Sequence, residues 1–430
     1  MKSNWKEYTV QELIDLGMLE EPLDGNHGSI HPKASDYVDS GVPFIMANNI
    51  INGVVDLDGC AFITEEQANT LRKGFAKPGD VLLTHKATIG RTAIVPDKYE
   101  TIILTPQVTY YRTIKGIDNR YLKYYFDSPF FQETLTNWAG SGSTRAYLGI
   151  LAQHKLPIIL PPYDEQIKIA GLLDLLDKKI LVNTEINENL LAQAKTLFKS
   201  WFVDFEPFNE SMVLSPAGNP VPKSLKMVQI QDLPHLLETG KRPKGGAVPQ
   251  GVPSVGAENV KSLGIFDASS TKYIPLDFAA SMKRGKIEGY ELLLYKDGGK
   301  PGTFTPHFSM FGEGFPYKEF YINEHVFKLD FFNRGFNEFA YLYLQTDYPY
   351  HWLANNGGKA AIPGINQQDV NSIWIYHPNH PQVQDFCTWI QPLFTSILTN
   401  CAQNMKLARI RDTLLPKLMT GELDVSSINI

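Results

Sequence analysis

The residues of this chain that could do chemistry do not have the spacing of a known catalytic motif. Residues 160–163 read LPPY, but Leu160 cannot accept a hydrogen bond from a substrate amine as Asp or Asn would. GGKPG at Gly298 and GGKA at Gly357 are not phosphate-binding loops, because neither lysine precedes Ser or Thr. The sequence has no HExxH, no GxSxG and no Cys/His cluster. We therefore expect no catalytic residue and no metal site, which favours a binding protein over an enzyme.

Basic side chains gather in short stretches that also contain glycine or hydroxyl residues, namely THKATIGR, GSGSTR and KRPK. Such loops can approach DNA closely, and long basic side chains can bond phosphates or base edges. The alternative interpretation is that each cluster is only a solvated surface. The candidate DNA-binding residues are Thr84, Lys86, Thr88, Arg91, Ser143, Thr144, Arg145, Lys241, Arg242, Lys244, Lys300 and Lys359.

Composition limits the class of protein. The 430 residues are 43% hydrophobic and 20% charged, as in an ordinary globular protein of roughly two to four domains. The net charge of −6 argues mildly against nucleic acid, although local basic clusters matter more than the total. The three cysteines are far apart, the start does not resemble a signal peptide, and no run of about 18 apolar residues occurs. We expect a cytoplasmic protein without a membrane partner.

The sequence repeats itself with a nearly constant offset. GVPFIMANNI and GVPSVGAENV begin 210 residues apart, WAGSGSTRAYLGI and WLANNGGKAAIPGI 214 apart, and ILVNTEINENL and ILTNCAQNMKL 217 apart. Matches in the same order indicate that one half was duplicated. Lys300 and Lys359 are candidates because their loops are comparable with those of Lys86 and Arg145.

Each half ends in a predicted long amphipathic helix. Apolar residues at spacings of three and four extend over 169–201, after an entry at PPYDEQ. The second seam, 383–418, is less regular, and we expect Pro392 and Pro416 to kink or shorten it. Because a long amphipathic helix does not remain single in water, we expect the two to pair antiparallel as a coiled coil. The alternative is that each packs on its own domain.

Both seams contain asparagines where apolar residues would be expected. They are Asn183 and Asn187 in the first helix and Asn400 and Asn404 in the second. A buried asparagine in a coiled coil fixes the register, because sliding leaves its amide unpaired. Register matters when the distance between the attached domains matters.

The end of the first helix has more aromatic residues than packing of a single helix face against a partner helix would use. Phe198, Trp201 and Phe202 are either packed against the adjacent domain or form a docking surface for a partner subunit. The sequence leaves both interpretations open.

Several of these stretches resemble the specificity subunits of type I restriction–modification systems. PPYDEQIKIAGLLDLLDKKI with NENLLAQAKTLFKSWFVDFEPF resembles the first central helix of that family. GDVLLTHKATIGRTAIVP and GSGSTRAYL resemble segments of its target-recognition domains. The resemblance extends over essentially the whole chain, although YKDGGKPGTFTP and NHPQVQDFCTWI in the second half depart from the pattern.

The resemblance implies an α+β fold in which two pseudo-symmetric α/β target-recognition domains are separated by two long antiparallel helices. It implies a non-catalytic subunit that reads a bipartite target in double-stranded DNA and sets the spacer with its paired helices. Its implied partners are two methyltransferase subunits and motor-nuclease restriction subunits, which would bind S-adenosylmethionine, ATP and Mg. The predicted segments are 1–160 (first recognition domain), 161–206 (helix), 207–225 (linker), 226–377 (second recognition domain), 378–424 (helix) and 425–430 (tail).

Two other functions remain open at this point. The chain could be the DNA-binding scaffold of another phage-defence or regulatory complex, whose partner would not be an adenine methyltransferase. It could also be an adenine-DNA methyltransferase with an unrecognised site, which would methylate DNA without partners.

Overall fold

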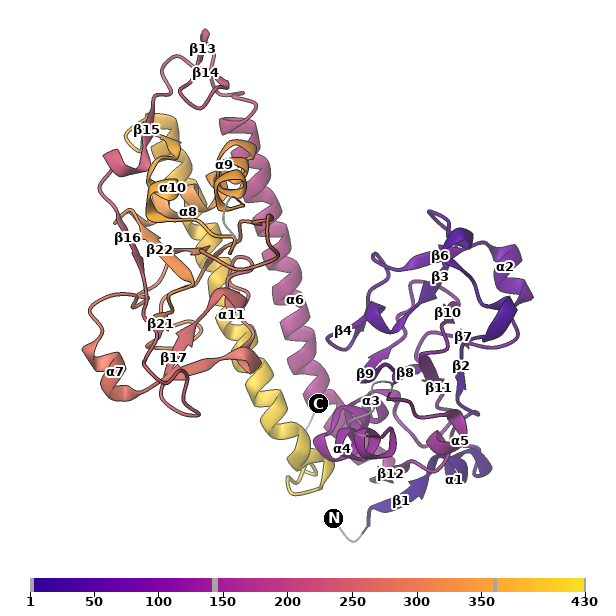
Figure 1. The fold of residues 1–430 in the computed structure, drawn as a ribbon. Coiled ribbons are helices and arrows are strands. Elements are labelled where there is room, and N and C mark those ends of the chain that lie inside the picture. Colours follow the sequence, from indigo (N-terminus) through magenta and orange to yellow (C-terminus); the bar gives the residue numbers. More distant parts are fainter. Residues whose placement is uncertain (1–3, 141–145, 359–361, 429–430) are drawn as a thin grey trace. The chain divides into compact units, whose positions relative to one another are not determined.

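The computed structural model describes residues 4–140, 146–358 and 362–428 (Figure 1). The chain forms two compact units. The first contains Met1–Lys178 with Leu407–Ile430, and the second contains Lys179–Lys406. Each unit therefore includes one recognition-type domain and a section of each long helix.

Two four-stranded sheets form the centre of the first unit. Their strand orders are β2-β11-β8-β9 and β6-β3-β10-β7, and β1 pairs antiparallel with β12. The strands are β1 (Lys6–Thr9), β2 (Leu23–Asp24), β3 (Val42–Ile45), β4 (Ile50–Ile51), β5 (Val54–Val55), β6 (Ala61–Ile63), β7 (Phe75–Ala76), β8 (Val81–Lys86), β9 (Thr88–Ile94), β10 (Ile102–Leu104), β11 (Val108–Tyr111) and β12 (Pro157–Leu160). The helices are α1 (Val10–Asp15), α2 (Glu65–Thr70), α3 (Asn119–Asp127), α4 (Pro129–Trp138) and α5 (Ile150–Gln153).

The second unit contains sheets of order β16-β22-β19-β20 and β18-β17-β21, with β15 paired antiparallel to β23. The strands are β13 (Met212–Leu214), β14 (Pro220–Pro222), β15 (Met227–Gln229), β16 (Leu236–Thr239), β17 (Val252–Val255), β18 (Lys272–Ile274), β19 (Leu292–Tyr295), β20 (Phe308–Met310), β21 (Tyr321–Ile322), β22 (Val326–Asp330) and β23 (Trp374–Tyr376). The helices are α7 (Leu276–Ser281), α8 (Arg334–Tyr343), α9 (Asp347–Gly357) and α10 (Gln367–Asn371).

The two domains have the same topology, which confirms the pseudo-symmetry expected from the sequence. The order β2-β11-β8-β9 in the first unit matches β16-β22-β19-β20 in the second. The parallel pair β3 and β10, with β6 antiparallel to β3, corresponds to β17 and β21 with β18. A single bridge from Lys286 to Tyr321 stands where the first unit has β7 paired with β10. The repeated stretches of sequence therefore lie at equivalent positions in the two domains.

Both long helices form. α6 (Tyr163–Phe202) begins after Pro162, has Asp164 and Glu165 in its first turn and Lys199 in its last, charges that complement the helix dipole. α11 spans Pro381–Met419. The boundary between the two compact units cuts through both helices, whereas the sequence placed them between the domains.

α11 continues through both of its internal prolines, so the expectation that they shorten the second helix was wrong, and a kink at either proline stays a prediction. A proline inside a helix removes one backbone hydrogen bond and costs roughly 3 kcal/mol. Near Pro392, Ile390 and Phe394 are fully buried, and near Pro416, Leu418 is buried. Burial of an apolar side chain contributes about 1.5–3 kcal/mol, so packing on either side of each proline offsets the lost bond.

The helices pair antiparallel within the second unit, as expected. Asn183 Nδ2 donates to Asn404 Oδ1 at 2.8 Å, and one turn later Asn400 Nδ2 donates to Asn187 Oδ1 at 2.9 Å. Partner numbers on α11 fall as residue numbers on α6 rise, which defines the antiparallel direction.

The segments predicted as linker and tail are packed against their units. In 207–225, Val221 and Leu225 are buried in the core of the second unit. In 425–430, Val425 is buried in the core of the first unit, and Lys168 Nζ donates to the Ser426 carbonyl at 2.6 Å. The C-terminal residues therefore belong to the first unit.

Candidate nucleic-acid interface

The β8–β9 hairpin carries the four candidate residues of the THKATIGR stretch. Thr84 is fully buried, and its Oγ1 accepts a hydrogen bond from the Arg91 backbone N at 2.9 Å. Lys86 and Thr88 are exposed at the turn, where Ala87 has a φ of 64°. The hairpin thus presents Lys86 and Thr88 to solvent, while Thr84 holds the two strands together.

The segment after GSGSTR is held directly against this turn. Ala87 N donates to the Ala146 carbonyl at 3.1 Å, and Lys86 forms an antiparallel bridge with Tyr147. Lys86 Nζ lies 5.8 Å from the centre of the Tyr147 ring. Ser143, Thr144 and Arg145, and Lys359 of the second half, lie outside the described residues. The structure therefore brings the residues that directly follow GSGSTR to the turn of the THKATIGR hairpin.

A buried histidine that was not selected from the sequence supports both the hairpin and the segment that follows GSGSTR. His85 Nδ1 donates to the Leu148 carbonyl at 2.9 Å, and Leu148 N donates to the His85 carbonyl at 3.0 Å. Burial lowers the pKa of His85, and its Nε2 lies 4.0 Å from an Asp24 carboxylate oxygen. A neutral imidazole therefore fixes the segment beside the hairpin. The available sequence signal was a histidine soon after the apolar run 81–83 of the same strand.

Arg91 is exposed, but one nitrogen of its guanidinium is already hydrogen-bonded within the domain. Its Nη1 donates to the Ala47 and Ile50 carbonyls, each at 3.2 Å. These bonds fasten β9 to the turn that precedes β4. Arg91 therefore holds the sheet, and only its remaining donors are available to a ligand.

The second unit repeats the loop pairing. Gly298 N donates to the Pro363 carbonyl at 2.9 Å, as Ala87 N does to Ala146 in the first unit. Lys300 is exposed in the loop that follows Gly298. In both domains the same backbone contact therefore joins the loop that carries Lys86 or Lys300 to the residues that follow GSGSTR or GGKA.

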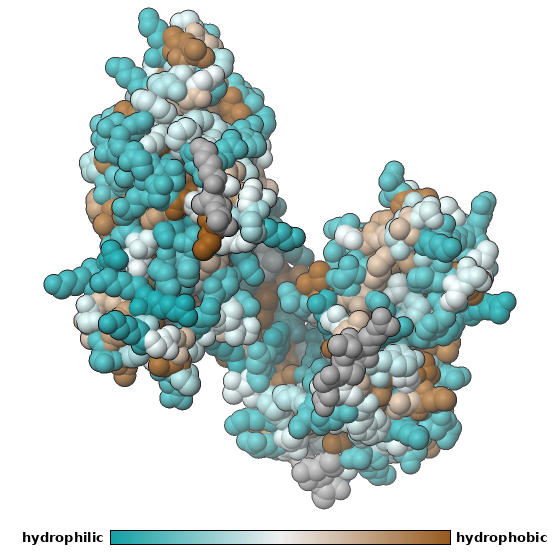
Figure 2. Space-filling model, viewed as in Figure 1, coloured by the Kyte–Doolittle hydropathy of each residue, from teal (hydrophilic) through white to brown (hydrophobic). Residues whose placement is uncertain are grey.

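The KRPK stretch follows β16. Lys241, Arg242 and Lys244 are exposed, and Arg242 Nη1 lies 3.9 Å from the Glu324 carboxylate. The face seen in Figure 2 has hydrophilic side chains over much of each unit, with apolar ones scattered among them. A scattered pattern of this kind is usual for protein surfaces.

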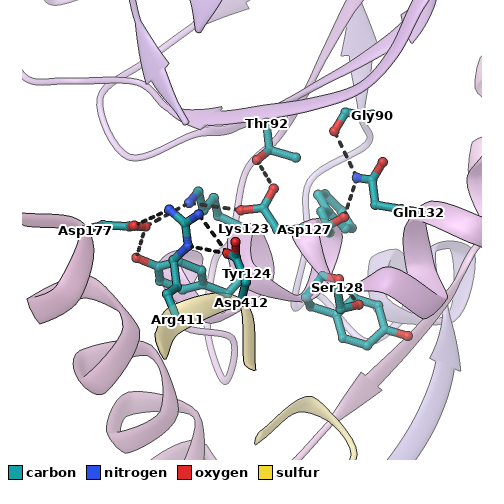
Figure 3. Close-up of polar contacts among 12 residues, drawn as sticks. Gly90, Thr92, Lys123, Tyr124, Asp127, Ser128, Gln132, Asp177, Arg411 and Asp412 are labelled. Carbon is teal, nitrogen blue, oxygen red and sulfur yellow. Dashed lines mark hydrogen bonds and ion pairs between the residues drawn. The ribbon is translucent and has the colours of Figure 1, made fainter. Parts of the chain in front are cut away.

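The hairpin of the first unit is attached to both long helices through α3 (Figure 3). Thr92 of β9 donates to Asp127 of α3, and Lys123 lies 3.0 Å from the same carboxylate. Lys123 also lies 3.5 Å from Asp177 of α6, which accepts a hydrogen bond from Arg411 of α11 at 2.7 Å. Strand, recognition-domain helix and both long helices therefore share one polar network.

Neighbouring cations favour the ionised form of Asp177 in this network. Burial opposes ionisation of Asp177, but Lys123 and Arg411 beside it keep its pKa below the usual value. Gln132 of α4 adds a second anchor, donating to the Gly90 carbonyl of β9 at 2.9 Å (Figure 3). Gly90 has a φ of 89°, which favours glycine, and a Cβ there would lie 2.1 Å from the Gln132 Oε1, so a larger residue would displace the Gln132 side chain.

The three aromatic candidates lie in the core of the second unit. Phe198 and Phe202 are 3% and 2% exposed, and Trp201 is half-buried. The ring of Phe202 makes edge contacts with Phe339 at 5.0 Å and Phe386 at 5.3 Å. This burial favours the core-packing interpretation, and docking through these residues stays a prediction.

The four asparagines lie at the helix pair, as their spacing predicted. Asn183 is buried, and its Nδ2 also donates to Gln403 Oε1 at 2.7 Å. Asn404 Nδ2 lies 3.3 Å from the Ile180 carbonyl, and Asn187 Nδ2 lies 3.5 Å from Cys401 Sγ. The amides therefore pair across the helices, and their role in fixing register stays a prediction.

Membrane-spanning and metal-binding features are absent over the described ranges, 4–140, 146–358 and 362–428. There, no helix has the length and apolar character needed to cross a bilayer. In the same ranges, His, Cys, Asp and Glu side chains do not cluster in groups of three or more that could hold a metal ion.

Comparison with known proteins adds the family to this geometry. Residues 2–192 match the type I restriction modification DNA specificity domain. The chain is 28% identical over 434 aligned residues to the type I restriction enzyme MjaIX specificity subunit of Methanocaldococcus jannaschii, covering 98% of this chain and 95% of that one. Residues 2–192 therefore match that domain family, and the chain as a whole is similar to type I specificity subunits. The match to the HindI specificity subunit of Haemophilus influenzae is 24% identical, over 62% of this chain and 69% of that one.

The fold is also similar to that of a solved specificity subunit. The crystal structure of a type I restriction–modification S subunit from M. genitalium aligns with a TM-score of 0.58, covering 96% of both chains at 15% identity. At this identity the likeness concerns the fold alone. The similarity to specificity subunits agrees with the expectation of a DNA-recognition component that is not itself an enzyme.

Proposed function

We propose that this specificity subunit reads a bipartite target in double-stranded DNA, one half with each recognition domain. The observation that carries the proposal is the duplicated loop pairing. Ala87 N bonds to Ala146 in the first domain, and Gly298 N bonds to Pro363 in the second. Each contact fixes the position of a loop that carries exposed basic and hydroxyl side chains beside a sheet. Basic side chains on fixed loops are suited to base edges, at about 1–3 kcal/mol of discrimination per good contact.

We further propose that the paired helices set the spacer between the two half-targets and dock two methyltransferase subunits. Residues 164–206 contain eight acidic and five basic residues, so this helix repels phosphates and suits a protein partner better than DNA. The amides paired across α6 and α11 oppose sliding, which a spacer-setting element requires. Motor-nuclease restriction subunits complete the proposed assembly in the cytoplasm.

The chemistry belongs to the partners in this proposal. S-adenosylmethionine is the methyl donor on the methyltransferase subunits, and ATP with Mg is used by the restriction subunits. The specificity subunit contributes DNA binding, orientation and spacing.

The test is genome-wide mapping of adenine methylation in the host with and without this chain. We expect one bipartite motif to lose methylation when the chain is deleted, since no other component would direct the methyltransferase to it. An unchanged methylation pattern would contradict the proposal. Labelled methyl transfer by the purified chain alone would support the enzyme alternative instead.

Two single substitutions sharpen this experiment. Lys86→Ala should relax recognition at one half of the motif and Lys300→Ala at the other, because each residue lies on a different domain. Lys226→Ala, at an exposed lysine directly before β15 and outside both loop pairs in the sequence, is the matched control and should leave the motif unchanged. Loss of both halves by either single variant would argue against independent reading.

A further inference from the structure

Two loops of the second unit meet at a glycine contact outside the loop pair described above. A Cβ at Gly240 would lie 1.6 Å from the Ile322 carbonyl oxygen, and a Cβ at Gly285 would lie 2.8 Å from the Gly240 Cα. Gly285 also has a φ of 80°. The backbones can cross here only because both residues are glycine. The KRPK loop after Gly240 and the KRGK loop around Gly285 are therefore neighbours.

The crossing concentrates positive charge on the surface. Lys241, Lys244, Lys283 and Arg284 are exposed. None of these four has an acidic side chain within ion-pair distance among the residues that the structure describes. Exposed cations without an acidic neighbour are available to an anionic ligand. Four of them lie on two adjoining loops, which concentrates positive charge at one place on the surface.

The backbone beneath these cations is fixed. Gly285 N donates to Glu238 Oε1 at 2.8 Å, and Lys328 Nζ lies 2.8 Å from the same oxygen. Lys328 also donates to the Lys286 carbonyl at 2.8 Å. The 283–286 loop is thus attached to β16 and β22, so its cations are presented with little loss of backbone freedom on binding.

Side-chain contacts connect this surface with the candidate base-reading loops of the same unit. Arg242 lies 3.9 Å from Glu324, whose carboxylate lies 3.3 Å from His325 Nε2. His325 Nδ1 contacts the Asp297 carboxylate. The backbone of Asp297 forms an antiparallel β-bridge with Gly364 in the second loop of the pair. The basic loops and the loop pair are therefore joined by one chain of contacts.

The first unit contains the same crossing. A Cβ at Gly25 would lie 1.9 Å from the Leu104 carbonyl oxygen, and a Cβ at Gly74 would lie 2.8 Å from the Gly25 Cα. There Lys73 pairs with the buried Asp24, so less charge is free than in the second unit. The crossing is thus a duplicated feature, and its free positive charge is greatest in the second domain.

We propose that the 241–244 and 283–286 loops bind the phosphate backbone of the DNA, and so set the position of the second domain while its loop pair contacts the bases. This inference rests on the proposed DNA-binding function. Phosphates fit because they are anions repeated along the duplex, whereas base edges need few, directed contacts. An acidic protein surface is the competing occupant.

The test compares two full-chain variants that lose the same charge. The first combines Lys241→Ala, Lys244→Ala, Lys283→Ala and Arg284→Ala. The control combines Lys195→Ala, Lys223→Ala, Lys226→Ala and Lys406→Ala, which are exposed residues of the same unit. Binding to a fluorescent duplex of about 40 base pairs is measured between about 50 and 200 mM salt, the range over which phosphate contacts dominate.

The slope of log affinity against log salt should become shallower by about 0.9 for each phosphate that the first variant no longer neutralises. The control should keep the wild-type slope, and both variants should unfold at the wild-type temperature because these side chains are exposed. Equal slopes in the two variants would overturn the inference alone. No DNA binding by the wild type would overturn the proposed function. Loss of partner co-purification with an unchanged slope would assign the surface to protein.

Discussion

At the scale of single residues, burial separates side chains that sequence alone treats alike. Thr84 and Thr88 lie in the same basic stretch, but Thr84 bonds the Arg91 backbone inside the hairpin and Thr88 is exposed. Phe198 and Phe202 are buried, whereas Lys86 and Lys241 are exposed. Residue type indicated the chemistry available, and the environment decided which residues can use it.

Glu338 of α8 gives a pH prediction at this scale. Its carboxyl group is fully buried, and burial raises its pKa to about 8 despite Arg334, whose Nε donates to it at 3.2 Å. The unfolded chain loses this proton near the ordinary pKa of 4.5 and the folded chain near 8. Stability therefore falls as pH rises between those values.

Glu338→Gln removes this titration while keeping an acceptor for Arg334. We expect the stability of the variant relative to wild type to increase from about pH 5 to about pH 8, as measured by urea unfolding. A relative stability that decreases over this range would mean that attraction to Arg334 outweighs burial.

At the scale of elements, the helix pair combines apolar packing with paired amides. Asn183, buried within the pair, donates to Asn404 and Gln403. Its Oδ1 is buried without a hydrogen-bond partner in the described part of the chain. An apolar pair could replace the whole amide pair without loss of stability, so the paired asparagines are better explained by specificity than by stability.

Substitutions across this pair test that explanation. Asn183→Leu should lower the free energy of unfolding by about 1 kcal/mol, because it leaves acceptors unpaired. Adding Asn404→Leu should restore at least part of it, since apolar packing replaces the amide pair. Calorimetry on both single variants and the double variant gives the coupling energy. Additive losses would show that the two amides are not coupled.

At the scale of the whole molecule, duplication gives two domains of the same topology with different surfaces. The loop pairing and the glycine crossing occur in both units, but Lys86 occupies the turn in one and Asp297 the corresponding place in the other. A scaffold that fixes loops by backbone contacts allows the side chains to change, and therefore the target to change, without loss of the fold.

The proposed spacer function predicts the effect of changing helix length. Deleting seven residues from each long helix removes about 10 Å of helix, because each residue rises about 1.5 Å. The recognised spacer should shorten by about three base pairs, at about 3.4 Å each, while both half-targets stay the same. Methylation mapping with the deletion variant measures this directly. An unchanged spacer would contradict the proposal that the helices set it.

The sequence by itself determined the duplication, the two long helices and the resemblance to specificity subunits, because periodicity, repeated stretches and specific motifs are local properties of the chain. It also placed the asparagines at the helix pair. Only the tertiary structure decided that α11 continues through Pro392 and Pro416, that His85 supports the loop pair, and that Gly240 and Gly285 bring two basic loops together. These outcomes depend on contacts between residues far apart in the sequence, where packing outweighs local preference.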